Sequence, residues 1–433
     1  MANIRPFRAY RYNLEKSNRL EDVIAPLFDV VTQDQREKLY ELPHNAIHLS
    51  VPRSIQEANA KLLEWKQAKI ITQDPLPAIY PYYQRFSLFG HSRAFERKGF
   101  ICAVQLKTSE NRSDIVLHEN TLSHSVNDRI QLLEQTQLNI APTHGLYEDA
   151  GFQIEPYLDE FMQCPILETI DYQNVVNKLG VIQHPEIIRK IQAFMANLPI
   201  YLADGHHRLE GSELVASRYF SRNPNASLQT PVNYHLMYLT NLRSDDVRIL
   251  PTHRLLHLPE KISTNDLLAK LEHFFSISCL DSRSPALLEI QGQKATFILC
   301  TQGQYYKLQL KQDFLPPQKI NLPIPDSLKE LDYTRLHYFI FDQILEIPYL
   351  EQGKSPVIQY WKDSAGVISQ VQEDTQKIGF LVNEVSMDEM LAVCNDHAKM
   401  PPKSTYFYPK VICGLVFYSI ASEDYVAPFD FSF

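Results

Sequence analysis

The segment between residues 185 and 220 constrains the fold more than any other part of this 433-residue chain. Pro185 to Met195 has apolar residues at helical spacing and begins with proline, which suits the first turn of a helix. Ile200 to Ala203 is a short apolar run that predicts a buried strand, and the chain turns at Asp204 and Gly205. Leu209 to Phe220 resumes a helical pattern. The segment therefore predicts a helix, a strand, a polar turn and a second helix.

Elsewhere, helical and strand patterns do not alternate regularly. We expect a helix at Ser125 to Asn139, a hairpin within Ala295 to Leu310 and a final strand at Val411 to Ser419. The proline-rich run from Phe314 to Pro325 predicts a linker, and a domain boundary is expected between His257 and Lys261. With 27 prolines and 13 glycines, a glycine-rich nucleotide fold is disfavoured. The mixture predicts the α+β class rather than a doubly wound parallel sheet.

Charge and composition exclude several functions. The formal net charge is -9 and no run of basic residues is present, which argues against a nucleic-acid partner. No apolar stretch reaches the length of a membrane span, so we expect no membrane partner. The N-terminus lacks the apolar core of a signal peptide, and the six cysteines form no C-x-x-C pair. A cytoplasmic protein with reduced cysteines is therefore expected.

The densest group of reactive side chains runs from Asp204 through Gly205, His206 and His207 to Arg208. It follows a predicted buried strand and precedes a predicted helix, where backbone N–H groups and the helix dipole favour anions. A polar helix cap, with Asp204 capping and Arg208 in a surface ion pair, is an equally open interpretation. Zinc is disfavoured, because neighbouring histidines point apart and no cysteine lies nearby.

Three further segments carry groups suited to acid–base or phosphate chemistry. His118 and Glu119 precede the helix expected at Ser125, so Glu119 could be a general base or an exposed turn carboxylate. His253 and Arg254 follow a strand-like segment. The third segment contains Lys403, Ser404 and Thr405. These residues could bind a phosphate, or they could belong to a solvated proline-rich loop.

Taken together, these segments are similar to those of a bacterial protein family first described without a function. The similarity covers nearly the whole chain. Its marks here are Ile4 to Arg8, Ala25 to Val30, Ala203 to Arg208, Leu250 to Arg254, and Pro402 to Lys410.

That family in turn resembles the free serine kinases of the ParB/sulfiredoxin-like superfamily. Those enzymes have a P-H-E segment, a D-G-H-H-R segment and a later P-K-T-T segment. This sequence departs from them at Leu117, where proline is usual, and at Tyr406 and Phe407, where Arg-His follows the threonines. The resemblance implies a ParB/sulfiredoxin-like catalytic domain at residues 1–258. It also implies a second α+β domain at 259–433 that contributes the PPKST loop, with the active site in the interdomain cleft.

The resemblance implies a Mg²⁺-dependent kinase that transfers a phosphoryl group from ADP or ATP to a small hydroxy acid or amino acid, with L-serine the leading acceptor. A nucleotide-hydrolysing switch of the ParB type and a non-enzymatic interaction protein remain alternatives. The implied roles begin with Glu119 as the catalytic base and Asp204 as the Mg²⁺ ligand. Arg208 and one of His206 or His207 would neutralise the transferred phosphoryl group, and the nucleotide phosphates would be bound by Gly205, Lys403, Ser404 and Thr405. His253 and Arg254 could bind the acceptor carboxylate.

Overall fold

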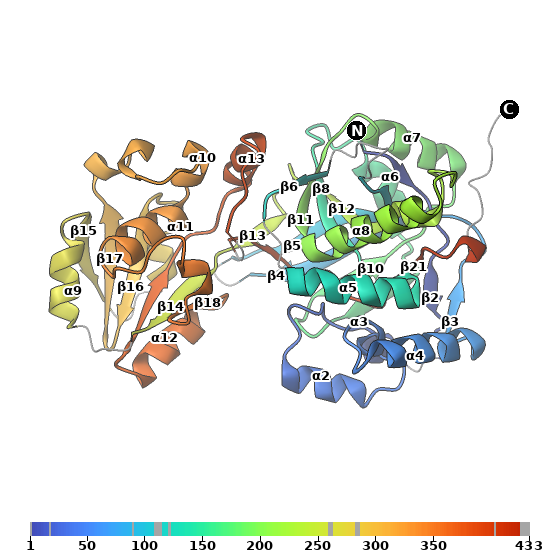
Figure 1. The fold of residues 1–433 in the computed structure, drawn as a ribbon, viewed down its shortest axis with the longest axis horizontal. Helices are drawn as coiled ribbons and strands as arrows, with labels where there is room; N and C mark the ends of the chain where they lie inside the picture. The colour runs from blue at the N-terminus through green and yellow to red at the C-terminus, as the bar shows by residue number, and fades with distance from the viewer. Residues whose placement is uncertain are drawn as a thin grey trace. The chain divides into compact units, whose positions relative to one another are not determined.

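A computed structural model describes residues 2–16, 19–88, 91–107, 115–119, 123–258, 263–281, 286–401 and 404–424. The described chain is an α+β structure that divides into two compact units (Figure 1). Unit 1 comprises Met1–Leu117, Thr121–Val247 and Pro409–Phe433, and unit 2 comprises His118–Asn120 and Arg248–Tyr408. Both units are therefore assembled from separate stretches of sequence. The boundary expected after residue 258 lies inside the second stretch of unit 2.

Unit 1 is built on a large mixed sheet with strand order β6-β11-β8-β12-β5-β4-β10-β9, and β1 also pairs with β5. β11 is parallel to β6 and β12 is parallel to β8, whereas the remaining neighbours are antiparallel. The strands are β1 (Ile4–Arg5), β4 (Tyr80–Ser87), β5 (Ala94–Gln105), β6 (Ile115–Leu117), β8 (Thr143–Tyr147), β9 (Leu167–Ile170), β10 (Val176–Leu179), β11 (Ile200–Asp204) and β12 (Tyr234–Asn241).

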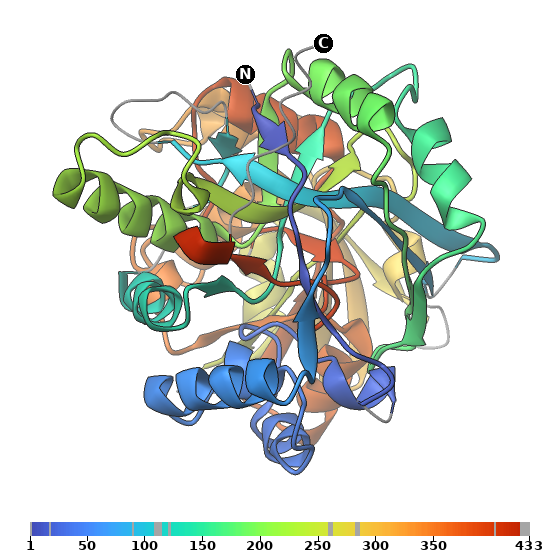
Figure 2. The same cartoon turned by 90° about the vertical axis from the view of Figure 1, so that its right-hand side faces the viewer.

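Helices cover this sheet. Helices α5 and α8 lie side by side (Figure 1), and in Figure 2 they lie toward the left of unit 1, with α6 and α7 toward the right. Two short ribbons, β2 (Tyr10–Tyr12) with β3 (Ile71–Gln73) and β7 (Leu138–Asn139) with β21 (Tyr418–Ser419), complete the unit. The helices are α1 (Leu20–Val23), α2 (Gln33–Tyr40), α3 (Ile47–Ser50), α4 (Ile55–Gln67), α5 (Ser123–Thr136), α6 (Glu155–Met162), α7 (Pro185–Met195) and α8 (His206–Arg222).

The predicted helix–strand–turn–helix segment of unit 1 is confirmed, with one correction. Helix α7 begins at Pro185 and buries Ile188, Ile191 and Met195, whose spacing gives one apolar face. Helix α8 begins at His206, earlier than the expected Leu209. The first turn of α8 carries polar residues that are nevertheless buried, so the apolar pattern does not reveal it.

Two other expectations about unit 1 needed correction. The helix expected to reach Asn139 ends at Thr136, because Gln137 adopts a positive φ of 51° and the next residues pair with β21. The strand expected over residues 411–419 is formed only at Tyr418–Ser419. Gly414, at a φ of 101°, interrupts the extended run, and the preceding residues make only isolated bridges such as Ala25 with Cys413.

Unit 2 contains an antiparallel sheet in the order β15-β17-β16-β19-β14-β18, with a separate ribbon of β13 and β20. Its strands are β13 (Arg248–Leu250), β14 (His253–His257), β15 (Phe275–Leu280), β16 (Thr296–Thr301), β17 (Gln304–Leu310), β18 (Ile358–Trp361), β19 (Lys377–Leu381) and β20 (Tyr406–Tyr408). Its helices are α9 (Thr264–Leu271), α10 (Asp326–Lys329), α11 (Asp332–Arg335), the π-helix Leu336–Asp342, α12 (Ser364–Glu373) and α13 (Met387–Asn395).

The hairpin predicted in unit 2 is confirmed as β16 and β17, which turn at Gly303 with a φ of 84°. The proline-rich run from Phe314 to Pro325 is not a linker, because it forms short turns between β17 and α10 within unit 2. None of the described helices combines the length and the apolar character that crossing a bilayer requires.

Candidate functional site

The start of helix α8 is set by a glycine. Gly205 occupies the N-cap position with a φ of 96°, a conformation that side chains with a Cβ rarely adopt. A Cβ at this position would lie 2.6 Å from Thr143 Cγ2, so the close approach to β8 also requires glycine. No side chain caps the helix, and no acidic residue occupies its first turn. The 17-residue helix therefore begins directly behind β11 without a carboxylate of its own to neutralise its dipole.

Asp204, the last residue of β11, lies between two buried cations. Arg208 Nη2 donates to Asp204 Oδ2 at 2.8 Å, and Lys410 Nζ contacts Asp204 Oδ1. All three side chains are buried. Burial alone would raise the pKa of the Asp204 carboxyl, but the charges of Lys410 and Arg208 outweigh it and hold this pKa well below its ordinary value. Asp204 is therefore ionised, and the group carries one net positive charge.

Arg208 is further held by backbone, since its Nη1 donates to Pro142 O at 2.6 Å. The two histidines of the same turn differ in exposure: His206 is buried and His207 is half-buried. Burial lowers the pKa of His207, although the nearby carboxylates of Asp29 and Glu210 oppose the effect. His207 is thus neutral near pH 7 and can accept or donate a hydrogen bond.

A magnesium ion does not fit the described surroundings of Asp204. Each carboxylate oxygen is already paired with a buried cation, so a Mg²⁺ ion there would be a third positive centre at a single carboxylate, whereas Mg²⁺ sites are built from anionic and neutral oxygens. Among the residues that the structure describes, no group of three or more His, Cys, Asp or Glu side chains is arranged to hold a metal ion. We therefore assign no catalytic step to a metal held by Asp204.

In unit 2, His118 lies beside Met400 and Thr405. His118 is fully buried, and its Nε2 lies 3.0 Å from Thr405 Oγ1. Met400 N donates to His118 O at 2.7 Å, and Glu119 forms a parallel bridge with Met400. Ser404 Oγ donates to Pro401 O at 2.7 Å. Two segments that the sequence singled out separately are thus neighbours. Lys403 lies outside the described residues.

His253 and Arg254, at the start of β14, are also buried. Arg254 Nε donates to His337 Nε2 at 2.9 Å, and its guanidinium lies over the Tyr360 ring at 4.6 Å. Burial lowers the pKa of Arg254 to about 10. Among the described residues, no carboxylate forms an ion pair with Arg254. His253 Nδ1 accepts from Val382 N at 3.3 Å, and burial followed by the charge of Arg254 lowers its pKa to about 4.

Comparison with known proteins identifies the family. The model of the family described as protein of unknown function (DUF1015) matches residues 4–334. The chain belongs to this family. The DUF1015 match includes Glu119, the segment from Asp204 to Arg208, and His253 with Arg254, but it ends before Lys410. No curated protein matches the sequence.

Solved structures with some similarity were also found. One is a conserved hypothetical protein from Pyrococcus furiosus, with 11% identity over 71% of this chain and 94% of that chain, at a TM-score of 0.31. A free serine kinase in complex with AMP has 10% identity over 70% and 88% of the two chains, at a TM-score of 0.32. SbnI with a C-terminal truncation, from Staphylococcus aureus, has 11% identity over 73% and 86%, at 0.34.

Sequence reasoning missed Lys410, although it lies at the end of a segment already noted for its similarity to the family. Lys410 and Asp204 are 206 residues apart, and no local pattern links them. Asp29 also lies in a segment that resembles the family, but no role for it follows from the sequence. In the structure, its negative charge opposes the lowering of the His207 pKa. Burial is what distinguishes Lys410 from the other described lysines, and the burial of a lysine cannot be read from a sequence.

Proposed function

We propose that this DUF1015 chain is a small-molecule kinase, which transfers a phosphoryl group from ADP or ATP to the hydroxyl of a small acceptor, with L-serine the leading candidate. The observation that carries the proposal is the glycine-capped start of α8 beside the buried group of Asp204, Arg208 and Lys410. Backbone N–H groups and the dipole at such a helix start favour phosphate. The ParB/sulfiredoxin-like assignment of the N-terminal part belongs to the same proposal.

The fixed charges of this group support the proposal. Two buried cations, Arg208 and Lys410, are held beside Asp204 at the start of α8. A phosphate bound at this helix start would accept charge-assisted hydrogen bonds from donors of this kind. Phosphoryl transfer requires mainly positioning and charge neutralisation from the protein, which fixed cations and N–H groups provide. In this proposal Arg208 and one of His206 or His207 act on the phosphoryl group, and Gly205 permits the close approach.

Unit 2 supplies the remaining proposed roles. Glu119 accepts the proton of the acceptor hydroxyl, because it is the half-buried carboxylate next to the His118–Thr405 contact. Ser404, Thr405 and Lys403 bind phosphate in this scheme. His253 and Arg254 bind the acceptor carboxylate, and the buried guanidinium without an ion-pair partner in the described chain supports that role for Arg254. Magnesium enters the proposal only as the counterion that the nucleotide brings.

The test is a direct assay of the full chain. The protein is incubated with Mg²⁺ and either ADP or ATP across a panel of hydroxy amino acids and hydroxy acids, and phosphorus NMR follows the products. We expect a new phosphomonoester, phosphoserine first, in an amount equal to the AMP or ADP that appears. Nucleotide loss without a phosphorylated acceptor would indicate a hydrolase or switch instead. Absence of both binding and turnover with every nucleotide would exclude the enzymatic function.

A further inference from the structure

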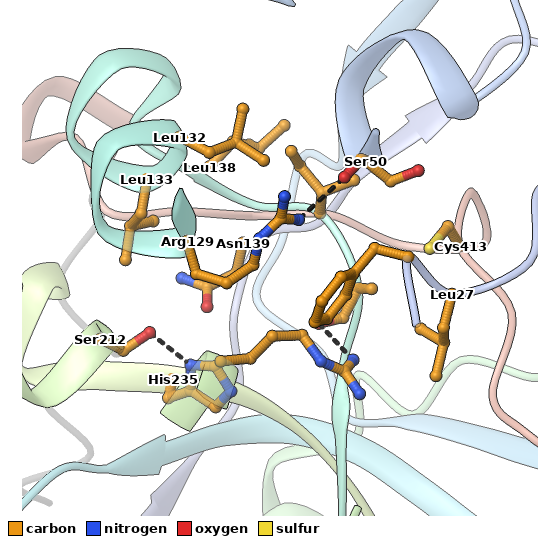
Figure 3. A pocket seen from close by; sticks show the side chains of 14 residues that line it. Leu27, Ser50, Arg129, Leu132, Leu133, Leu138, Asn139, Ser212, His235 and Cys413 are labelled. Atoms are coloured by element: carbon orange, nitrogen blue, oxygen red, sulfur yellow. Dashed lines mark hydrogen bonds between the residues drawn. The ribbon is translucent and has the colours of Figure 1, made fainter. Parts of the chain in front are cut away.

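A pocket in unit 1 lies between α5 and α8, on the side of α8 that carries Arg208 and Ser212. It leaves about 50 Å³ for the centres of water molecules. In Figure 3, Ser212 and His235 lie on the lower side of the pocket and Arg129, with its contact to Ser50, on the upper side. Leucines from α5 close one end. Among the described residues that line it are two arginines and no aspartate or glutamate.

Three buried polar atoms of the lining side chains have no hydrogen-bond partner among the described residues: Arg208 Nε, His235 Nε2 and Asn139 Nδ2. The side chains expose only 8%, 1% and 6% of their surface. Two of these side chains are held in place by their other nitrogens. Arg208 Nη2 donates to Asp204, and His235 Nδ1 lies 2.8 Å from Ser212 Oγ. Buried polar groups of native proteins are normally hydrogen-bonded, so three such atoms around one cavity indicate a missing partner.

The chemistry of these atoms defines that partner. The Nε–H of arginine and the amide nitrogen of asparagine can only donate, so the ligand must present acceptors. His235 Nε2 is a third donor when the Ser212 hydroxyl donates to Nδ1. Arg129 is paired with Asp128 and Arg208 with Asp204, but neither carboxylate lines the cavity. The two guanidinium groups are therefore the charged groups of its wall, and they favour a negative charge there. A water needs roughly 10–15 Å³ of such space. The cavity therefore suits a group of a few heavy atoms, and it is too small for a nucleotide.

We propose that this pocket binds a small oxyanion, a carboxylate or a phosphate group, through Arg208 Nε, the Asn139 amide and His235. The site goes beyond the proposed kinase function, because Asn139, His235, Ser212 and Arg129 have no role there. Arg208 connects the two, since its Nη2 donates to Asp204 while the same side chain lines the pocket. The occupied pocket would thus fix the side chain that positions Asp204 at the start of α8.

The experiment uses the full chain and two probes, inorganic phosphate and acetate, each against chloride at equal ionic strength. Thermal unfolding and calorimetry measure binding to the wild type, to Asn139→Leu and to Asn197→Leu. Asn197 is exposed in the same unit and serves as the matched control. We expect at least one probe to raise the Tm of the wild type and of Asn197→Leu saturably. In Asn139→Leu its affinity should fall by roughly tenfold to a hundredfold, as for a lost hydrogen bond to a charged group.

Asn139→Leu also has a signature that a purely structural asparagine would lack. Without anion, its Tm should equal or exceed that of the wild type, because the substitution removes an unpaired buried amide. Asn139→Asp keeps the side-chain size but repels an anion, so it should lose binding as well even if the leucine variant fails to fold. A response to phosphate alone or to acetate alone identifies the source of the oxyanion.

No stabilisation of the wild type by either probe would overturn the proposal, and so would an unchanged response in both Asn139 variants. Nucleotide binding is measured in the same variants. Loss of the oxyanion site with nucleotide binding retained, or the reverse, separates this inference from the kinase proposal.

Discussion

Two buried arginines, Arg208 in unit 1 and Arg254 in unit 2, are balanced in different ways. Arg208 shares the carboxylate of Asp204 with Lys410, so its charge is met by a fixed anion of the protein. Arg254 donates to a neutral histidine, His337, and to the carbonyl of Thr252, and its pKa falls to about 10 because it is buried. The same side chain is thus held by an ion pair in one unit and by neutral groups in the other.

The difference separates the consequences of removing a charge in the two units. A buried ion pair fixes both side chains, and removal of one partner leaves an uncompensated charge. A buried cation held by neutral acceptors retains its attraction for an anion, because no charge in the protein satisfies it. We therefore expect substitution of Asp204 to act mainly on stability and nucleotide binding, and substitution of Glu119 or Arg254 to act mainly on acceptor chemistry.

The largest expected effect concerns catalysis in unit 2. If Glu119 is the general base, Glu119→Gln should lower kcat by about 10²–10⁴-fold, a barrier increase of roughly 3–5 kcal/mol. Nucleotide affinity should stay within about twofold by calorimetry, because the proposed base contacts the acceptor hydroxyl and not the nucleotide phosphates. Glu15→Gln, at an exposed glutamate, is the matched control. Wild-type turnover in Glu119→Gln would remove this residue from the mechanism.

Asp204→Asn tests the ion-paired side of the comparison. It would leave Lys410 and Arg208 buried together without an anion, so the free energy of unfolding should fall by roughly 3–5 kcal/mol. Urea denaturation measures the loss, and Asp34→Asn, at an exposed aspartate of α2, should change little. A loss below about 1 kcal/mol would mean that the group is balanced by something other than this carboxylate.

The acid sensitivity of unit 2 gives a third test. Burial, followed by the charge of Arg254, lowers the pKa of His337 to about 3, whereas an unfolded histidine titrates near 6.5. Below about pH 6.5 the unfolded chain binds a proton that the folded chain does not. Stability therefore falls as the pH drops toward 3, by up to about 1.4 kcal/mol per pH unit. In His337→Gln this part of the slope, followed by denaturation at several pH values, should disappear. An unchanged slope would show that His337 is protonated in the fold.

The smallest expected change in stability is that of Arg254→Met. The substitution removes a buried charge without an ion-pair partner in the described chain but leaves His337 Nε2 and Thr252 O without their donor, so the two effects nearly cancel within about 1 kcal/mol. Acceptor affinity should nevertheless fall, by roughly tenfold or more, in steady-state kinetics. A loss of stability as large as that of Asp204→Asn would contradict the distinction between the two arginines.

Local sequence patterns predicted the elements that depend on near neighbours. Helix α7 and the β16–β17 hairpin follow from spacing, proline and turn residues within their own segments. The α+β class also followed from the pattern of elements. The end of α5 did not, because it depends on pairing between β7 and β21, far apart in the chain.

The candidate site shows the same limit. The segment from Asp204 to Arg208 stood out by its density of polar groups. Its partner Lys410 and the pocket at Asn139 and His235 did not, because an unpaired buried atom or a long-range ion pair has no signature in a single sequence. The neighbourhood of His118 and Thr405 likewise becomes visible only in three dimensions.

The discontinuous make-up of unit 1 has a consequence for synthesis in the cell. Its buried group includes Lys410, and its ribbon with β7 includes Tyr418, both contributed by the stretch that begins at Pro409. A chain emerges from the ribosome N-terminus first, so all strands of the large sheet, which end at Asn241, are made before unit 2. The ribbon of β7 with β21 and the contact of Asp204 with Lys410 cannot form until residues 248–408 have been translated. Ribosome-bound chains that stop before residue 409 should therefore be cut by protease within unit 1, whereas the same sites should be protected once residue 424 has left the exit tunnel.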